Sequence, residues 1–431
     1  MKVINSAEKI TSFGGFNFVF EAYKKSGLGR LIDCELGDRV KQWGFNYSDI
    51  ILNHLAVYFN GGDTTEDINE HLRTPMQSIR GMKVCSADTI LRGLKELSIS
   101  SQIIEHPESK IQHQFNINRK LNRLLIQSLL LTGQLNTAQK FILDYDNKII
   151  PTEKLDAART YQKTSGYQPG VASVNNLVVY VEGRNGNSQA KFKQDETLKR
   201  VFANLAQQEI KISKFRADSA SCQNEVIEVV EQNSDFFYIR AISSLKMQQR
   251  IGCIAAKNWK KVRIGTQKME VSELRSYRLL GGQRSYRLVV SRIPREDKQI
   301  NLFTGEAYVY RSILTNDRKT SAKSIIAFYN QRGESERLFD VMNNDFGWTH
   351  LPCSYLSENT AYMILTSLYS NFYRYIISSF SEKLHWLQPT FRLKKFIFRF
   401  IAVAAKWIKT GRRYVLKLYT DKDYCPLFAP T

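Results

Sequence analysis

The spacing of apolar residues changes at Lys140, and this change most constrains the fold. Before it, apolar residues recur with helical spacing, so residues 1–135 are predicted to be mainly helical. After it, Phe141–Asp146, Leu177–Glu182 and Phe236–Ala241 have the pattern of strands. Helices are predicted over 195–207 and 223–232. Strands that come first and then alternate with helices indicate an α/β fold with a mixed sheet flanked by helices.

The pattern of residue types changes twice more in the second half of the chain. Short strand patterns around a Gly281-Gly282 turn predict a β-rich insertion, and helices resume at Ser321. The tail is rich in Lys, Arg and aromatic residues, and a basic helix pair is predicted over Phe391–Tyr414. The predicted order is a helical region (1–135), the first part of a core (136–242), the insertion (243–315), the last part of the core (316–350) and a basic helical region (351–431).

The charge of the chain indicates a polyanionic partner. A formal net charge of +21 over 431 residues gives a positive surface potential, which favours nucleic acid, although a ribosomal or membrane surface would also fit. The longest apolar region, Ala361–Phe380, contains Asn371 and Arg374, so it predicts a buried helix and no membrane span. The six scattered cysteines predict reduced thiols and a cytoplasmic location.

A DNA-recognition helix is one of two interpretations of Ser86–Leu97. Ser86 is an N-cap candidate, and Arg92 and Lys95 lie on the helix that follows. A short helix after another helix and a turn is typical of a helix-turn-helix, in which Arg92 would contact DNA. An ordinary amphipathic core helix explains the same pattern equally well.

Two acidic positions follow predicted strands. Asp144 and Asp146 lie two residues apart near the end of a strand and therefore share a face, with a solvated Asp-Asn turn as the ordinary alternative. Asp218 lies where a strand gives way to a helix, where it would also serve as a helix cap. Carboxylates at the edge of a sheet are accessible to a metal ion and a substrate.

A third acid lies in the segment from Ala327 to Phe339. Tyr329, Arg332 and Glu336 have the spacing Y-x2-R-x3-E, which on one helix places them along a common face; Glu334 falls on another face. Glu336 in a surface salt bridge is the ordinary alternative. Three converging carboxylates suit two Mg²⁺ ions, with Mn²⁺ as a substitute, and Arg332 would neutralise phosphate charge.

The combined pattern resembles the DDE-type insertion-sequence transposases, specifically the cut-and-paste group with the Y-x2-R-x3-E signature. Leu-Asp-x-Asp, then Arg-x-Asp-Ser, then this signature occur in order, with a β-rich segment before the last. The family pattern D-x-T fits Asp146 with Lys148 in place of Thr, so Asp146 is preferred and Asp144 is the alternative. The family often has a Lys seven residues after the Glu, where this chain has Asn343. Gly166-Tyr167-Gln168-Pro169 also resembles a family feature.

The resemblance implies a fold, a site and an activity. It implies an RNase H-like core whose acids Asp146, Asp218 and Glu336 hold the metal ions, with Tyr329 and Arg332 on the phosphate next to the cleaved end. A further hypothesis is that Trp259, which lies among lysines, would stack on a flipped base, with a buried tryptophan of a β-domain as the ordinary alternative.

The implied protein is a bacterial, cytoplasmic DNA transposase that associates with the nucleoid when it is bound to DNA. It would bind terminal inverted repeats and target DNA as a homodimer in a synaptic complex, and it would have no membrane partner. The alternatives are a metal-dependent nuclease without strand transfer and an inactive DNA-binding derivative.

Overall fold

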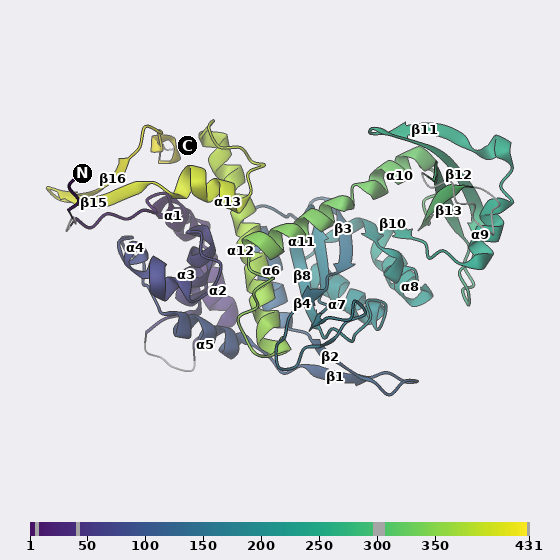
Figure 1. Cartoon of the computed structure of the whole chain (residues 1–431), viewed down its shortest axis with the longest axis horizontal. Helices are drawn as coiled ribbons and strands as arrows, with labels where there is room; N and C mark the ends of the chain where they lie inside the picture. The colour runs from purple at the N-terminus through teal and green to yellow at the C-terminus, as the bar shows by residue number, and fades with distance from the viewer. Residues whose placement is uncertain (5–7, 40–43, 296–306, 429–431) are drawn as a thin grey trace.

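A mixed sheet of 11 strands runs through the computed structural model, which describes residues 1–4, 8–39, 44–295 and 307–428 (Figure 1). The order of its strands is β1-β2-β8-β7-β3-β9-β10-β14-β13-β12-β11. The α/β class with a mixed sheet is therefore confirmed. The five middle strands are β3 (Lys140–Asn147), β7 (Gly170–Val174), β8 (Leu177–Arg184), β9 (Lys211–Ala217) and β10 (Ser234–Arg240).

The middle strands combine antiparallel and parallel pairing. β3, β7 and β8 form an antiparallel meander, and β9 and β10 then add parallel to β3 on its other side. The predicted helices are present as α7 (Gln194–Gln207) and α8 (Asn224–Asn233). Because β3, β9 and β10 are parallel, their carboxyl ends meet at one edge of the sheet.

The β-rich insertion extends the main sheet. It begins with α9 (Leu245–Gly252) and η3 (Ala256–Asn258) and continues as β11 (Lys260–Ile264), β12 (Gln267–Tyr277), β13 (Tyr286–Pro294) and β14 (Tyr308–Thr315). β14 pairs antiparallel with β10, so the insertion is continuous with the core through backbone hydrogen bonds.

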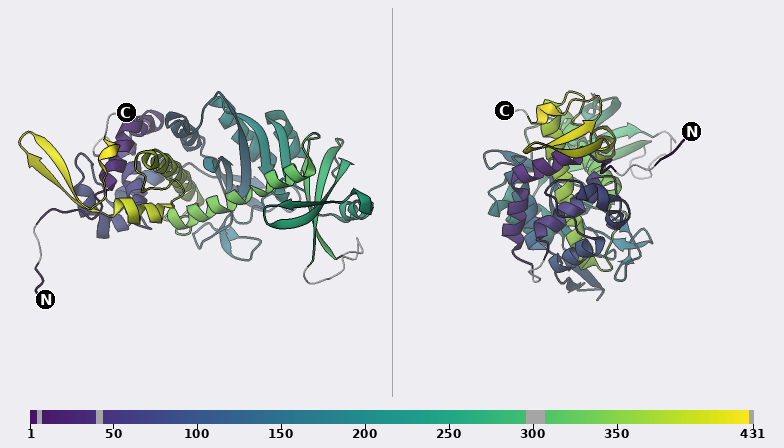
Figure 2. Two further views of the ribbon diagram at one scale, coloured as in Figure 1. Left: turned by 90° about the horizontal axis from the view of Figure 1, so that it is seen from above. Right: turned by 90° about the vertical axis from the view of Figure 1, so that its left-hand side faces the viewer.

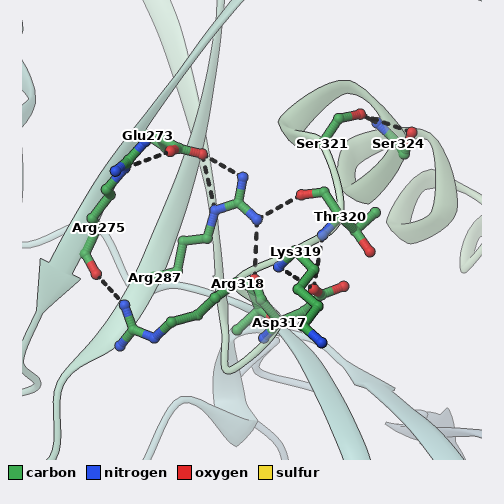
Figure 3. A network of polar contacts seen from close by, with 10 residues as sticks. Glu273, Arg275, Arg287, Asp317, Arg318, Lys319, Thr320, Ser321 and Ser324 are labelled. Atoms are coloured by element: carbon green, nitrogen blue, oxygen red, sulfur yellow. Dashed lines mark hydrogen bonds and ion pairs between the residues drawn. The ribbon is translucent and has the colours of Figure 1, made fainter.

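A buried arginine connects the insertion to the next helix (Figure 3). Arg287 forms an ion pair with Glu273 and donates from Nη1 to the carbonyl oxygens of Asp317, at 3.0 Å, and Thr320, at 2.6 Å. Burial opposes ionisation of Asp317, but hydrogen bonds from Thr320, Lys319 and Tyr238 lower its pKa to about 2. This network holds the turn from which α10 (Ala322–Asn330) starts, with Ser321 as its N-cap.

The N-terminal region is mostly helical, but it also contains two strands. Its elements are α1 (Phe16–Ser26), α2 (Leu28–Leu36), α3 (Tyr47–Phe59), η1 (Ile68–Leu72), α4 (Arg73–Gln77), α5 (Ala87–Leu97), β1 (Gln102–Glu105), β2 (Gln112–Asn116) and α6 (Arg119–Leu131). β2 pairs with β8, so this region also contributes to the main sheet. α6 starts at Arg119, because the side chain of Asn118 caps the helix there by accepting from the backbone N–H of Leu121.

A long buried helix, α12 (Leu356–Lys383), lies between the N-terminal helices and the sheet (Figure 1). The side chain of Asn371 accepts from the N–H of Val178 in β8 at 3.0 Å and donates to its carbonyl oxygen at 2.8 Å. The prediction of a buried helix over Ala361–Phe380 is confirmed, and no helix of the described ranges is long and apolar enough to cross a membrane.

The Gly166-Tyr167-Gln168-Pro169 segment helps to place this long helix. It begins within β6 (Ser165–Tyr167), which forms a small sheet with β4 (Ile150–Pro151) and β5 (Ala158–Arg159). The Tyr167 hydroxyl donates to the carboxylate of Asp156, which also accepts from the backbone N–H of Leu356 at 2.9 Å. Asp156 therefore binds an otherwise unpaired N–H at the start of α12, and Tyr167 orients that carboxylate.

The C-terminal prediction is partly wrong. α11 (Gly333–Asp345), α13 (Leu393–Phe396), η4 (Ile397–Ile401) and η5 (Cys425–Leu427) are helical, but β15 (Ala404–Thr410) and β16 (Arg413–Tyr419) form a β-hairpin where the second predicted helix should be. The two-residue turn has Gly411 at φ 58°, a backbone conformation that glycine adopts without strain.

The two ends of the chain share one hydrophobic core. The backbones of Thr11 and Ala405 exchange two hydrogen bonds of 2.9 Å, and Gly15 lies so close to the carbonyl of Phe400 that a Cβ would not fit. Buried residues of the N-terminal helices, α12 and the C-terminal segment form a single cluster. We call this part, built from α1–α5, α13 and the hairpin, the helical lobe; it spans the predicted regions 1–135 and 351–431.

Candidate active site

Two aspartates lie side by side at the carboxyl ends of β3 and β9. In the register of these parallel strands, Asp144 is opposite Arg216 and Tyr145 is opposite Ala217, and the next positions are Asp146 and Asp218. The two carboxylates are close enough for the charge of Asp218 to raise the pKa of Asp146. The structure therefore brings together two of the three predicted acids.

Asp146 is largely buried and has an unusual pKa. Its side chain is 20% exposed. Burial and the neighbouring charge of Asp218 raise its pKa from 3.8 to about 6, although the Arg332 guanidinium opposes this rise. The folded protein therefore resists a negative charge here unless a further positive charge is bound.

Arg332 faces this pair with unused hydrogen-bonding capacity. Its Nη2 lies 2.8 Å from Oδ2 of Asp146, and the side chain is 13% exposed. This contact is an ion pair that does not have the alignment of a hydrogen bond. Nε and Nη2 of Arg332 are both buried, and neither has a hydrogen-bond partner among the described residues. Unpaired guanidinium N–H groups are costly in a free protein, and a phosphate oxygen would satisfy them.

The side chain of Tyr329 is buried and packs inside the protein. It is 7% exposed, and its hydroxyl donates to the carbonyl oxygen of Ala217 at 3.0 Å. This hydrogen bond ties α10 to the residue that precedes Asp218. The predicted contact between Tyr329 and phosphate would require this hydrogen bond to break, so we assign the residue a positioning role.

The third predicted acid is not close to the other two. The helix expected over Ala327–Phe339 is broken at Gln331-Arg332, so Tyr329 lies in the last turn of α10 and Glu336 lies in the first turn of α11, exposed to solvent. In the parts of the chain that the structure describes, no three His, Cys, Asp or Glu side chains are grouped closely enough to hold a metal ion. Glu334 accepts from Asn176 at 2.7 Å.

The alternative first acid has a structural role. Asp144 is 6% exposed, and both of its oxygens accept from Arg216, from Nε and from Nη2, at 2.7 Å each. The remaining Nη1 of Arg216 donates to the carbonyl oxygen of Phe328 at 2.9 Å. Both oxygens of Asp144 are therefore already engaged by Arg216 inside the fold, and the geometry favours Asp146.

Two further arginines that the sequence interpretation missed lie beside the acids. Arg240 ends β10, in register next to Asp218, and burial together with the charges of Arg311 and Arg332 lowers its pKa. Arg240, Arg311 and Ser219 line a cavity of about 270 Å³. Side chains alternate between the two faces of a strand, so Arg240 in β10 and Arg311 in β14 lie on the same face of the sheet as Asp146. This alternation is the sequence signal from which the two arginines could have been predicted.

Trp259 and Arg92 are placed away from the aspartates. Trp259 precedes β11, the outermost strand, and the Arg292 guanidinium lies 4.1 Å from its ring centre. Arg292 thus covers one face of the indole. A base would therefore stack on the other face of the indole or displace the Arg292 guanidinium. Arg92 is exposed on α5, whose buried face packs in the helical lobe.

The donor atoms of Asp146 and Asp218 fit a divalent metal ion. Carboxylate oxygens are the ligands that Mg²⁺ prefers, and water completes its shell. Within the described residues, Asp218 uses only Oδ1 in a hydrogen bond, from the N–H of Ala220 at 3.0 Å. Burial, with the charge of Asp218, raises the pKa of Asp146 in spite of Arg332, and a bound cation would stabilise its ionised form. Glu336 does not contribute in this arrangement.

We expect the stability of the metal-free protein to depend on the ionisation of Asp146. Because its pKa is raised on folding, the folded state binds more protons than the unfolded chain between about pH 4 and 6, and stability is lost as pH rises through this window. Relative to an Asp146→Asn variant, the unfolding free energy of the wild type should fall by about 2 kcal/mol across it. Urea unfolding in EDTA from pH 4 to 7 measures this; parallel profiles for the two proteins would contradict it.

Comparisons with known proteins complete the description of the site. A family model described as transposase DDE domain group 1 matches residues 1–430. No curated protein matches the chain. Among solved structures, the chain is similar to the piggyBac transposase in a cryo-EM synaptic complex with hairpin DNA, with a TM-score of 0.39 and 10% identity, covering 90% of this chain and 78% of that chain.

Proposed function

The chain belongs to the transposase family with a group 1 DDE domain, and we propose that it is the DNA transposase of an insertion sequence. It binds the terminal inverted repeats, cleaves at the element ends and transfers the 3′-hydroxyl ends to target DNA. The observation that carries this proposal is the pair Asp146–Asp218 at the carboxyl ends of two parallel strands, with Arg332 beside it. Ligands of open α/β sheets bind at this end of the strands.

In this proposal the core of the sheet is RNase H-like. The antiparallel meander β3-β7-β8, followed by β9 and β10 added parallel to β3, supports this assignment. Such a core requires an acid at the end of its first strand and another at the end of its fourth. Asp146 and Asp218 occupy these two positions.

Each residue of the site has a separate task. Asp146 and Asp218 would hold the metal ions, and bound Mg²⁺ supplies an activated attacking oxygen and neutralises the leaving oxygen. Arg332 directs its unpaired Nε–H and Nη2–H at the scissile phosphate and orients it. Tyr329 and Arg216 hold α10, and hence Arg332, against the ends of the strands.

Glu336 is the proposed third acid, and it must move to act. In the described arrangement it is exposed on the first turn of α11. The break at Gln331-Arg332 lets α11 rotate relative to α10 without loss of the contacts made by Tyr329. We propose that DNA binding brings Glu336 to the aspartates by such a rotation.

End recognition is assigned to the helical lobe. Arg92 lies exposed on α5, a helix that Ser86 caps and that follows another helix and a turn, as in a helix-turn-helix. Trp259 would stack on an unpaired base at the transposon end. Two element ends must be held together, so the active form is a homodimer on paired DNA ends.

DNA cleavage by the purified protein tests the proposal. The substrate is the element end with its flanking DNA, and a plasmid serves as the target, with Mg²⁺ or with EDTA. We expect cuts at the repeat boundary and joined products with Mg²⁺ only. Cuts without joined products would indicate a nuclease, and binding without cuts would indicate an inactive derivative; either result contradicts the transposase assignment.

A further inference from the structure

The hairpin of β15 and β16 projects from the helical lobe, at the end of the molecule opposite the insertion (Figure 2). Its seven cross-strand pairs run from Ala404–Tyr419 to Thr410–Arg413. Between Lys383 and Thr420 the chain has nine Lys and Arg and no Asp or Glu. We call this hairpin the basic ribbon.

The two faces of the basic ribbon differ. One face is directed at the lobe: Trp407 donates from Nε1 to Asn17 at 3.1 Å, and Leu416 and Leu418 pack against the core. The period of two places Lys406, Arg413 and Lys417 on the other face. The inner face therefore anchors the ribbon, and the outer face has no such function in the fold.

The outer face is electrostatically unfavourable in the free protein. Lys406 and Lys417 are directly opposite each other, a pairing that destabilises a sheet. Glu8 offsets it in part, through an ion pair with Lys406 at 2.9 Å. Arg412, at the turn, and Arg413 have no ion-pair or hydrogen-bond partner among the described residues. A polyanion would remove this repulsion.

Apolar side chains are interleaved with these cations. Val415 is 45% exposed and Tyr419 is 44% exposed, both on the outer face. Tyr414, nearer the turn, is covered by the Arg80 guanidinium, 3.8 Å from its ring centre. A surface that only attracts phosphate does not need exposed aliphatic and aromatic groups, whereas contact with base edges does.

We propose that the basic ribbon inserts into the major groove of double-stranded DNA. This groove is about 12 Å wide and admits a two-stranded ribbon. Arg412, Arg413 and Lys417 then bind the flanking phosphates, and Val415 and Tyr419 contact base edges, where the thymine methyl group is the apolar target. This inference rests on the proposed function, since it adds a DNA contact to the same protein.

Salt-dependent binding to a DNA duplex tests this inference. A variant with Arg412→Gln, Arg413→Gln and Lys417→Gln is compared with a matched variant, Lys191→Gln, Lys211→Gln and Lys268→Gln, whose three exposed lysines lie elsewhere. Both lose the same charge. The ribbon variant should reduce the slope of log K against log salt by about 2 to 3, since each lost phosphate contact removes about 0.9. The matched variant should keep the wild-type slope.

Two further measurements separate the alternatives. Methylation of guanine N7, which lies in the major groove, should weaken binding of the wild type but not of the ribbon variant. A double-stranded RNA has a deep, narrow major groove that excludes the ribbon, so both proteins should bind it equally. Equal thermal unfolding midpoints of the variants confirm that the fold is intact.

The outcomes distinguish this inference from the proposed function. If the wild type does not bind duplex DNA, the transposase assignment itself fails. If the wild type binds and the ribbon variant has the affinity and salt slope of the matched variant, only the ribbon inference is overturned. An equal loss on RNA and DNA would mean a contact with phosphate without groove insertion, which also overturns it.

Discussion

Replacement of Asp218 by Asn is expected to lower the rate of Mg²⁺-dependent DNA cleavage by about 10³-fold or more, equivalent to about 4 kcal/mol of transition-state stabilisation. Asn has nearly the shape of Asp and can still accept the hydrogen bond from Ala220, so the turn after β9 should be kept. What is lost is the charge that would hold a metal ion beside Asp146. The same loss is expected for Asp146→Asn.

Single-turnover cleavage of a pre-bound DNA end measures this effect separately from binding. Both variants should bind the DNA at least as tightly as the wild type, because a negative charge near the phosphate is removed. Glu334→Gln is the control for Glu336→Gln: both acids lie in the first turn of α11, but Glu334 is paired with Asn176. If Glu336→Gln cleaves as fast as this control while Asp218→Asn does not, Glu336 is not the third acid.

Loss of one partner of the Asp144–Arg216 ion pair is expected to destabilise the fold by about 3–5 kcal/mol. The pair is almost completely buried, with 6% and 5% exposure, so Asp144→Leu leaves a buried guanidinium without its counter-charge. Arg216→Met has the equivalent effect on Asp144 and also removes the donor to Phe328. Urea unfolding measures both free energies.

The double variant Asp144→Leu with Arg216→Met distinguishes a charge effect from a packing effect. Two apolar side chains leave no unpaired buried charge, so the double variant should recover most of the stability lost in either single variant. Additive losses would contradict this account. A folded double variant that still cleaves DNA would also exclude Asp144 as a metal-binding acid.

The local sequence pattern was sufficient to predict most of the helices and strands and the positions of two of the acids. The strands around Asp146 and Glu182 and the helices α7 and α8 were predicted correctly because their apolar periods are local properties. The positions of Asp146, near the end of β3, and of Asp218, directly after β9, were predicted for the same reason.

Tertiary packing determined the features that the local sequence patterns could not predict. Asp144 and Asp146 share a face, so periodicity cannot separate them; only Arg216, 72 residues later, shows that Asp144 is already paired. The C-terminal hairpin was mistaken for a helix because an apolar and basic segment suits either, whereas its strands pair with each other and Ala405 pairs with the distant Thr11. Distant contacts of this kind have no signature in a single local stretch.

The sequence by itself determined the family, the α/β class and the positions of two acids at the ends of strands, because these depend on residue type and local spacing. Only the tertiary structure decided that Asp144 is structural, that Tyr329 fastens α10 and that Arg240 and Arg311 lie beside Asp218. It also decided that Lys406, Arg413 and Lys417 of the tail lie on one face of a ribbon. These properties arise when strands and helices that are distant in sequence pack together, and a side chain acquires its role from the neighbours that this packing gives it.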